Sequence, residues 1–164
     1  MLLAEALKER STLEGEIREL KSRIAAVAVH SEDEPAEEVA QDLLDTLLAK
    51  ISQVAELTAR INRANNTVSV RFEGRPYTLM SAVLLRDELK RKAEAVRSIL
   101  TEVERGLGGH GDYGYGRRRA KDEVKLVSDL TAAALRSQAE SFSAALNALD
   151  MEIQKVNFTA ALTE

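Results

Sequence analysis

Apolar residues recur at alternating steps of three and four along four long stretches of this 164-residue chain. Such spacing places apolar side chains on one face of an α-helix and favours knobs-into-holes packing between neighbouring helices. The sequence therefore predicts four long helices, over about residues 3–27, 35–64, 79–105 and 128–156. The apolar seam predicted for the second helix consists of Leu44, Leu47, Ile51, Val54 and Ile61.

Local signals predict where these helices begin and end. The pair Asn65-Asn66 is expected to break the second helix, because Asn tolerates the left-handed conformation that closes helices. Gly106 is expected to stop the third helix, and Ser128 to cap the start of the fourth. Between helices two and three, apolar residues alternate with polar ones over residues 68–72. Glu73-Gly74 follows, which predicts a short β-hairpin with Gly at its turn.

The predicted fold class is mainly α, with four long helices in an antiparallel bundle or coiled-coil arrangement and one short β-hairpin between helices 2 and 3. We expect residues 1–164 to form a single helical-bundle domain, with a Gly-rich loop over residues 106–118. The alternative is that the helices pair as long hairpins and complete their core only with another chain.

Composition narrows the classes of protein that fit. Aromatic residues are 4% of the chain and Trp is absent, so the core is expected to be aliphatic. A net charge of -4 argues against stable nucleic-acid binding, which usually requires a basic surface. The longest apolar run, Ile24–Val29, is far shorter than the roughly 20 residues of a membrane span. Charges within the first ten residues argue against a secretory signal, so a cytoplasmic location is expected.

Surplus apolar residues lie outside the predicted seams and predict self-association, because they widen the apolar stripe beyond what one packed face needs. The chain is therefore expected to form a homo-oligomer. The surplus positions are Leu7, Leu43, Leu48, Leu57, Leu84, Leu85 and Ile99.

Arginine interrupts two of the seams, at Arg10 in the first helix and Arg86 in the third. In an up-down-up-down bundle, one end would collect both arginines with nearby amides and carboxylates. Three interpretations stay open: a pocket for an anion or small ligand, a polar layer that fixes helix register, and arginines that extend to solvent at the seam edge. The candidate polar cluster is Arg10, Asn62, Asn65, Arg86, Asp87, Asp150, Gln154 and Asn157.

The Gly-rich loop carries aromatic and basic side chains, and two interpretations of it stay open. Tyr113, Tyr115, Arg117, Arg118 and Arg119 have the composition of a single-strand nucleic-acid contact, and equally of a loop at a subunit interface. A Gly-x-Gly-x-x-Gly pattern begins at Gly106, but a helix rather than a strand precedes it, which argues against nucleotide binding.

No catalytic motif is found, and neither histidine has a second metal ligand at helical spacing. We therefore expect no enzyme activity, no cofactor and no metal.

Three segments of the chain, in order, resemble a family of small, uncharacterised bacterial helical proteins, some of which are named septicolysin. The segments are Leu57–Asn65 ahead of the short hairpin, Leu85–Leu89, and Asp150–Thr159. The chain has Ala64 where the family pattern has Thr, and Phe158 where the family has Trp. The family name implies a pore-forming cytolysin, and only under that alternative is contact with a membrane expected. The short predicted hairpin falls below the 9–11 residues per strand that cross a bilayer.

These observations together predict an uncharacterised, non-enzymatic helical-bundle protein that acts through self-assembly or partner binding. Two alternatives stay open: a septicolysin-like cytolysin, and a protein that binds a small ligand or anion at a polar end of the bundle.

Overall fold

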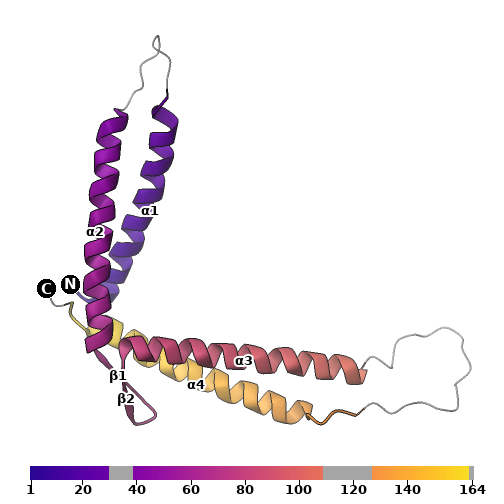
Figure 1. Cartoon of the computed structure of the whole chain (residues 1–164). Helices are drawn as coiled ribbons and strands as arrows, with labels where there is room; N and C mark the ends of the chain where they lie inside the picture. Colours follow the sequence, from indigo (N-terminus) through magenta and orange to yellow (C-terminus); the bar gives the residue numbers. More distant parts are fainter. Residues whose placement is uncertain (30–38, 109–126, 163–164) are drawn as a thin grey trace, which may run out of the picture. The chain divides into compact units, whose positions relative to one another are not determined.

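A computed structural model describes residues 1–29, 39–108 and 127–162 of the chain. Four α-helices account for most of these residues, and a two-stranded β-hairpin lies between the second and the third (Figure 1). The elements are α1 (Leu3–Val27), α2 (Ala40–Thr67), β1 (Ser69–Phe72), β2 (Arg75–Thr78), α3 (Leu79–Gly108) and α4 (Ala132–Thr159). The predicted mainly α fold class, with four helices and a hairpin between α2 and α3, is therefore confirmed.

The chain divides into two compact units. Unit 1 comprises Met1–Met80 and Ile153–Glu164, and unit 2 comprises Ser81–Glu152. Unit 1 contains α1, α2, the β-hairpin and both chain ends, whereas unit 2 contains most of α3 and of α4. The expectation that residues 1–164 form one domain stays a prediction.

Within unit 1, α1 and α2 run antiparallel and pack along their length (Figure 1). An ion pair joins them where Lys50 Nζ lies 2.7 Å from Glu16 Oε2. The buried side chains at this interface lie at helical spacing, as the apolar periodicity predicts. They are Leu3, Ala6 and Leu20 on α1, and Leu47, Leu57, Ile61 and Ala64 on α2.

The seam of α2 differs from the predicted one. Leu44 and Ile51 are 38% and 42% exposed, whereas Leu57, which lay outside the predicted seam, is 6% exposed and packs in the core. The physical reason is that α2 carries two neighbouring apolar stripes. The spacing alone fits either stripe, and contact with α1 selects the one that contains Leu47, Leu57 and Ile61.

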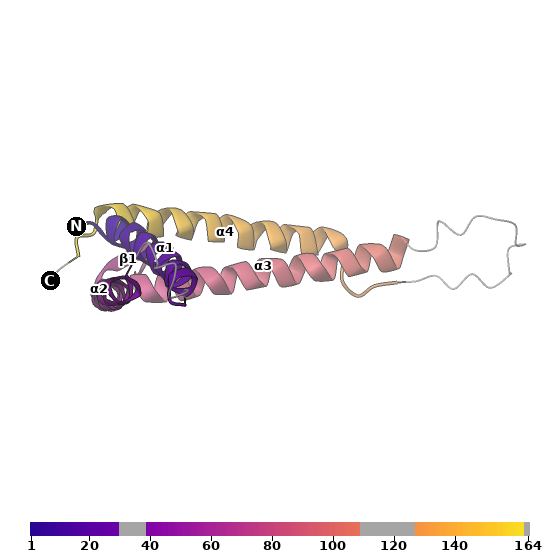
Figure 2. The same cartoon turned by 90° about the horizontal axis from the view of Figure 1, so that it is seen from above.

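Within unit 2, polar contacts between α3 and α4 show that the two helices are antiparallel neighbours (Figure 2). Arg136 pairs with Glu104 near one end. Arg97 Nη2 donates to Ser143 Oγ at 2.7 Å farther along. The Nζ of Lys92 lies 5.9 Å from the ring centroid of Phe142, within range of a cation–π interaction. The buried residues here are Ala82, Leu89, Ala93, Leu135, Ala139 and Leu149.

The β-hairpin has the predicted turn. Phe72 pairs with Arg75, so Glu73 and Gly74 form a two-residue loop. Both residues have positive φ, 48° and 76°, as a type I′ turn requires. Val70 and Phe72 are buried, whereas the alternate residues Ser69 and Arg71 are exposed, so one face of the hairpin contributes to the core.

Four predicted helix boundaries are wrong. Val39 is extended and α2 begins at Ala40, not near residue 35. Asn65 and Asn66 are helical and α2 continues to Thr67, after which Val68 is extended. Gly106 does not stop α3, which runs to Gly108. Ser128 does not cap α4: its Oγ accepts the Leu130 N–H in the preceding turn. Thr131 is the cap, because its Oγ1 accepts the Ala134 N–H and its carbonyl accepts the Leu135 N–H.

The two chain ends pair within unit 1. Leu2 and Ala161 form an antiparallel β-bridge. The Leu3 N–H donates to the Ala160 carbonyl and the Leu162 N–H to the Met1 carbonyl, both at 2.9 Å. Leu162 and Leu3 are buried beside this bridge. The start of α1 is therefore held by the segment that follows α4.

Candidate functional site

The predicted polar cluster divides between the two units. Arg86, Asp87 and Asp150 belong to unit 2, whereas the other five members belong to unit 1. The convergence of all eight residues at one end of a bundle stays a prediction.

Arg86 pairs with two carboxylates of unit 2. Its Nη2 lies 3.0 Å from Asp87 Oδ1, and its Nη1 lies 3.8 Å from Asp150 Oδ1 on the facing helix. The Arg86 side chain is 35% exposed, between the buried residues Ala82 and Leu89. The Arg86 guanidinium group thus links α3 to α4 through Asp150, and its charge is paired at the edge of the apolar seam. A polar layer between packed helices makes contacts of this kind.

Arg10 lies in the α1 seam of unit 1, between Ala6 and Leu13. Its Nε lies 3.7 Å from Glu14 Oε1, one turn along the same helix. The same Nε is buried and has no hydrogen-bond partner in the part of the chain that the structure describes. The amides of the predicted cluster also belong to unit 1, where Asn62 and Gln154 are exposed and Asn65 and Asn157 are half-buried.

The predicted contact loop cannot be placed. Tyr113, Tyr115, Arg117, Arg118 and Arg119 lie outside the described residues, so both interpretations of the loop stay predictions.

The first surface feature that the structure reveals is an exposed apolar stripe on α2. Leu44, Leu48 and Ile51 are 38%, 54% and 42% exposed. They follow steps of four and three, and exposed Ala55 continues the series. This is the spacing of a coiled-coil seam, and it lies beside the stripe that packs against α1. We call Leu44, Leu48, Ile51 and Ala55 the α2 stripe. The apolar periodicity predicts that Leu44 and Ile51 lie in the core, and of these three leucine and isoleucine positions it leaves only Leu48 as surplus.

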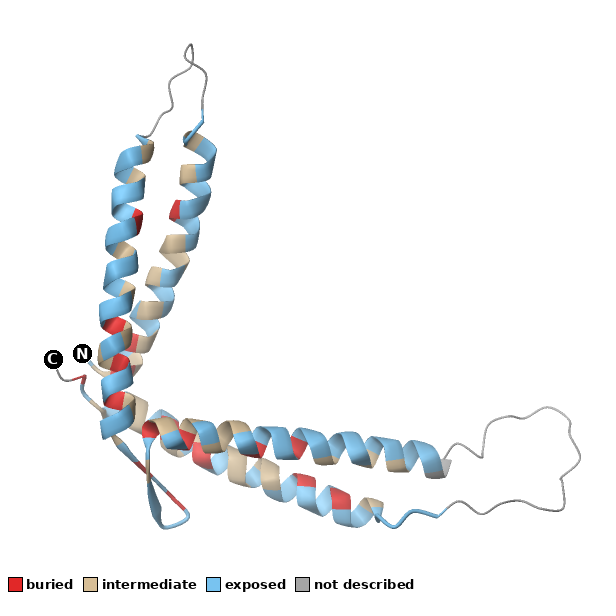
Figure 3. Cartoon of the chain, in the orientation of Figure 1, coloured by how far each residue is buried: buried red, intermediate tan, exposed pale blue. Residues whose placement is uncertain are grey.

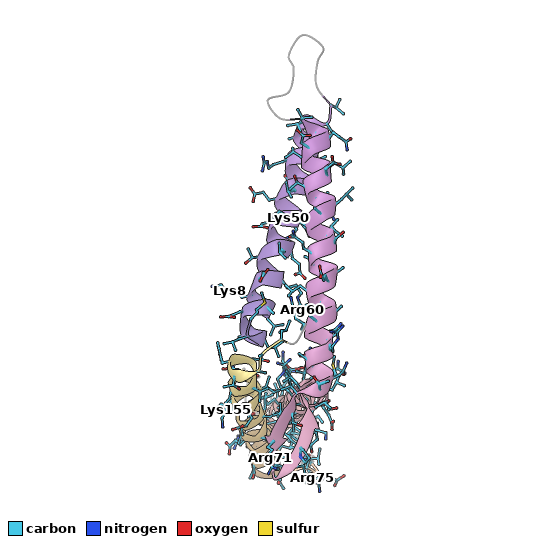
Figure 4. The ribbon with its side chains drawn as sticks, turned by 90° about the vertical axis from the view of Figure 1, so that its left-hand side faces the viewer. Lys8, Lys50, Arg60, Arg71, Arg75 and Lys155 are labelled. Carbon is cyan, nitrogen blue, oxygen red and sulfur yellow. The ribbon has the colours of Figure 1, made fainter. Side chains whose placement is uncertain are left out.

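The second feature is a pocket of about 180 Å³ between α1 and α2. Two residues at i and i+4 on α1 and four on one face of α2 form its walls, together with the N-terminal residue. Figure 4 shows Arg60 between the two helices. The lining residues are Met1, Glu9 and Leu13, and Gln53, Glu56, Leu57 and Arg60.

Polar groups in this pocket lack partners. The Nε of Arg60 is buried without a hydrogen bond. Among the described residues, the side chains of Glu9, Gln53 and Glu56, which are exposed, make no hydrogen bond or ion pair with another residue. No motif or interrupted seam in the sequence indicates Glu9, Gln53, Glu56 or Arg60. The sequence feature that could have indicated the pocket is the helical spacing of Gln53, Glu56 and Arg60, which places these polar residues around the buried Leu57.

Two further observations bear on function. No helix in the described ranges combines the length and the apolar content that a bilayer crossing requires. Within those same ranges, no group of three or more His, Cys, Asp and Glu side chains has the arrangement of a metal site.

Comparisons with other proteins give a family but no activity. No functionally curated protein matches the chain. A solved structure, "Crystal structure of a functionally unknown conserved protein from Corynebacterium diphtheriae", is 28% identical, with a TM-score of 0.74, and the match covers 99% of each chain. The resemblance to septicolysin-like proteins stays a prediction. A family model matches residues 10–162, and the chain therefore belongs to the "Family of unknown function (DUF6847)".

Proposed function

We propose that this protein is a non-enzymatic helical protein that acts by self-association, and that the α2 stripe is the contact between two copies. The observation that carries the proposal is the exposure of Leu44, Leu48 and Ile51 at coiled-coil spacing on a helix whose other apolar stripe already packs on α1. Figure 3 shows that both helices of this hairpin are exposed along most of their length, so a large surface is available for a partner.

A second copy fits this stripe because the charges along α2 are self-complementary. Asp42 and Asp45 lie near the start of the helix, and Arg63 lies near its end. If two copies of α2 pair antiparallel across a two-fold axis, the acidic start of each faces the basic end of the other. In that arrangement Leu44 packs opposite Asn62, and Ile51 opposite Ala55.

The expected affinity is modest. The exposed fractions of Leu44, Leu48 and Ile51 amount to somewhat more than one complete side chain in each copy. Their burial in a dimer releases roughly 4–8 kcal/mol, at roughly 1.5–3 kcal/mol for each fully buried side chain. Association itself costs at least roughly 4 kcal/mol. Additional contacts at Ala55 and between the charged ends are needed, and we expect a Kd between about 1 μM and 1 mM.

Sedimentation velocity over a wide range of protein concentration tests this proposal. The wild-type protein is expected to shift from monomer to dimer as its concentration rises. Leu48→Glu places a charge within the apolar contact and is expected to remain monomeric at every concentration, with unchanged helicity by circular dichroism. Leu84→Glu is the matched control, because Leu84 on α3 is 63% exposed and lies outside the α2 stripe.

Charge reversal tests the antiparallel arrangement. Asp45→Arg and Arg63→Asp are each expected to weaken the dimer, whereas the double variant restores the opposite charges and the dimer with them. A wild-type protein that stays monomeric at millimolar concentration, or a Leu48→Glu variant that dimerises as well as wild type, would overturn the proposal.

A further inference from the structure

The pocket between α1 and α2 has the chemistry of a ligand site, and we propose that it binds a small zwitterion with one carboxylate and one ammonium group. The molecule is of the size and kind of a short free amino acid. The pocket leaves polar groups unpaired, has a small volume, and carries charges of both signs along its walls.

The unpaired groups indicate what the pocket lacks. The Nε of Arg60 is buried and has no hydrogen-bond partner, although buried polar groups are nearly always paired. A guanidinium group binds a carboxylate through two parallel N–H···O bonds, which makes a carboxylate the natural partner for Arg60. Gln53 adds both an amide donor and a carbonyl acceptor to the same wall.

The negative charges in the pocket require a second, cationic group on the same ligand. Glu9 on α1 and Glu56 on α2 both line the pocket, and neither makes an ion pair with a described residue. An ammonium group has three N–H donors and can bind both carboxylates at once. With two carboxylates and one guanidinium, the walls repel a simple anion, whereas a simple cation leaves Arg60 unpaired. A zwitterion satisfies both.

The volume and the apolar surface of the pocket limit what the ligand can carry besides its two charged groups. The pocket volume of about 180 Å³ suits a small solute rather than a large one. Leu13, Leu57 and Met1 supply apolar surface for a short aliphatic portion. Drug-sized ligands, which need pockets of at least roughly 300 Å³, are too large.

The pocket is separate from the proposed dimer contact. An α-helix has 3.6 residues per turn. With this geometry, the pocket residues of α2 lie on roughly the opposite side of the helix from the α2 stripe. Failure of one proposal therefore leaves the other untouched. Ligand binding is best measured in the full-length Leu48→Glu variant, so that association does not alter the signals.

The test is a titration followed by two-dimensional amide NMR. Alanine and β-alanine are the zwitterion probes, acetate is the anion probe, and methylammonium is the cation probe. The zwitterions are expected to give saturable shifts of amides in α1 and α2, with at least tenfold higher affinity than either singly charged probe.

Variants connect binding to the named groups. Arg60→Gln and Glu56→Gln are each expected to reduce zwitterion affinity by about tenfold or more, as the loss of a charge-assisted hydrogen bond implies. Arg60→Lys keeps the charge and is expected to lose less. The matched controls are Arg18→Gln and Glu19→Gln, positions on α1 outside the pocket, and they are expected to bind like the parent protein.

Three results would overturn this proposal. They are the absence of saturable shifts with either zwitterion, binding of acetate as tight as that of alanine, and unchanged affinity in both Arg60 variants. The first result would mean that the pocket holds only water.

Discussion

Glu73 has a backbone conformation that residues with a side chain rarely adopt. Its φ is 48°, and it precedes Gly74 with φ of 76° in the turn of the β-hairpin. A Cβ atom added to Gly74 would meet open space, so the requirement for glycine there comes from the backbone conformation and not from crowding. The hairpin therefore forms despite a residue at its first turn position that is less suited to positive φ than Asn or Gly.

Replacement of Glu73 is expected to stabilise the protein. Glu73→Asn introduces the residue that type I′ turns prefer, and is expected to raise the free energy of unfolding by about 0.5–1 kcal/mol. Urea denaturation followed by circular dichroism measures this change. The matched control is Glu73→Gln, which removes the charge but keeps the unfavourable side chain, and is expected to leave stability unchanged. Equal stabilisation by both substitutions would mean that charge, and not backbone conformation, is the cause.

Charged residues in the apolar seams show two different outcomes. Arg86 pairs with Asp87 and with Asp150 on the facing helix, whereas the Nε atoms of Arg10 and Arg60 are buried without hydrogen bonds. The sequence indicated Arg10 and Arg86 because each interrupts a regular apolar series. Arg60 gave no such signal, because it lies at the edge of the α2 seam, and its importance depends on which face of α1 lies opposite.

At the scale of the helices, α4 depends on Thr131 for its start. Thr131 Oγ1 accepts the N–H of Ala134, and two helical residues of the first turn, Ala132 and Ala133, have no side-chain oxygen to offer. Loss of a side-chain cap typically costs about 1 kcal/mol.

Thr131→Ala is therefore expected to lower the free energy of unfolding by about 1 kcal/mol and to increase hydrogen exchange in the first turn of α4. Ser128→Ala is the matched control, because Ser128 Oγ bonds only within the turn before the helix, and we expect less than half of that effect. A larger effect at Ser128 than at Thr131 would contradict the assignment of the cap.

The helices themselves were predictable because their apolar residues repeat over six or more turns, and local alternatives cannot match so long a period. The hairpin was predictable because Glu73-Gly74 separates two short β-patterned runs. The choice between the two stripes of α2 was not predictable, because both satisfy helical spacing and only the partner helix decides. For the same reason the pocket was hidden: its residues come from two helices, and their meeting depends on how α1 and α2 pack.

At the scale of the molecule, unit 1 is held together by contacts between residues that are far apart in the sequence. The bridge between Leu2 and Ala161 fixes the first turn of α1, and Leu162 is 7% exposed beside it. Glu5 contributes locally, because its Oε2 accepts the Leu2 N–H at 2.7 Å.

Leu162→Ala is expected to destabilise unit 1 by about 2–4 kcal/mol, the usual cost when a buried leucine is truncated. Native-state hydrogen exchange should show the loss of stability first as faster exchange of amides in α1, although α1 is far from Leu162 in the sequence. Phe158→Ala is the matched control, because Phe158 is 67% exposed, and it is expected to change stability little. An unchanged exchange rate in α1 of Leu162→Ala would mean that the bridge does not stabilise this helix.

The pairing of the chain ends also sets an order of events during synthesis. Leu3 is synthesised more than 150 residues before Ala160, whose carbonyl receives the Leu3 N–H. Contacts of such high sequence separation form late, because a long loop must close before they can contribute. The α1–α2 hairpin can therefore assemble early on the nascent chain, whereas the first turn of α1 gains its hydrogen bond only after Ala160 has been translated.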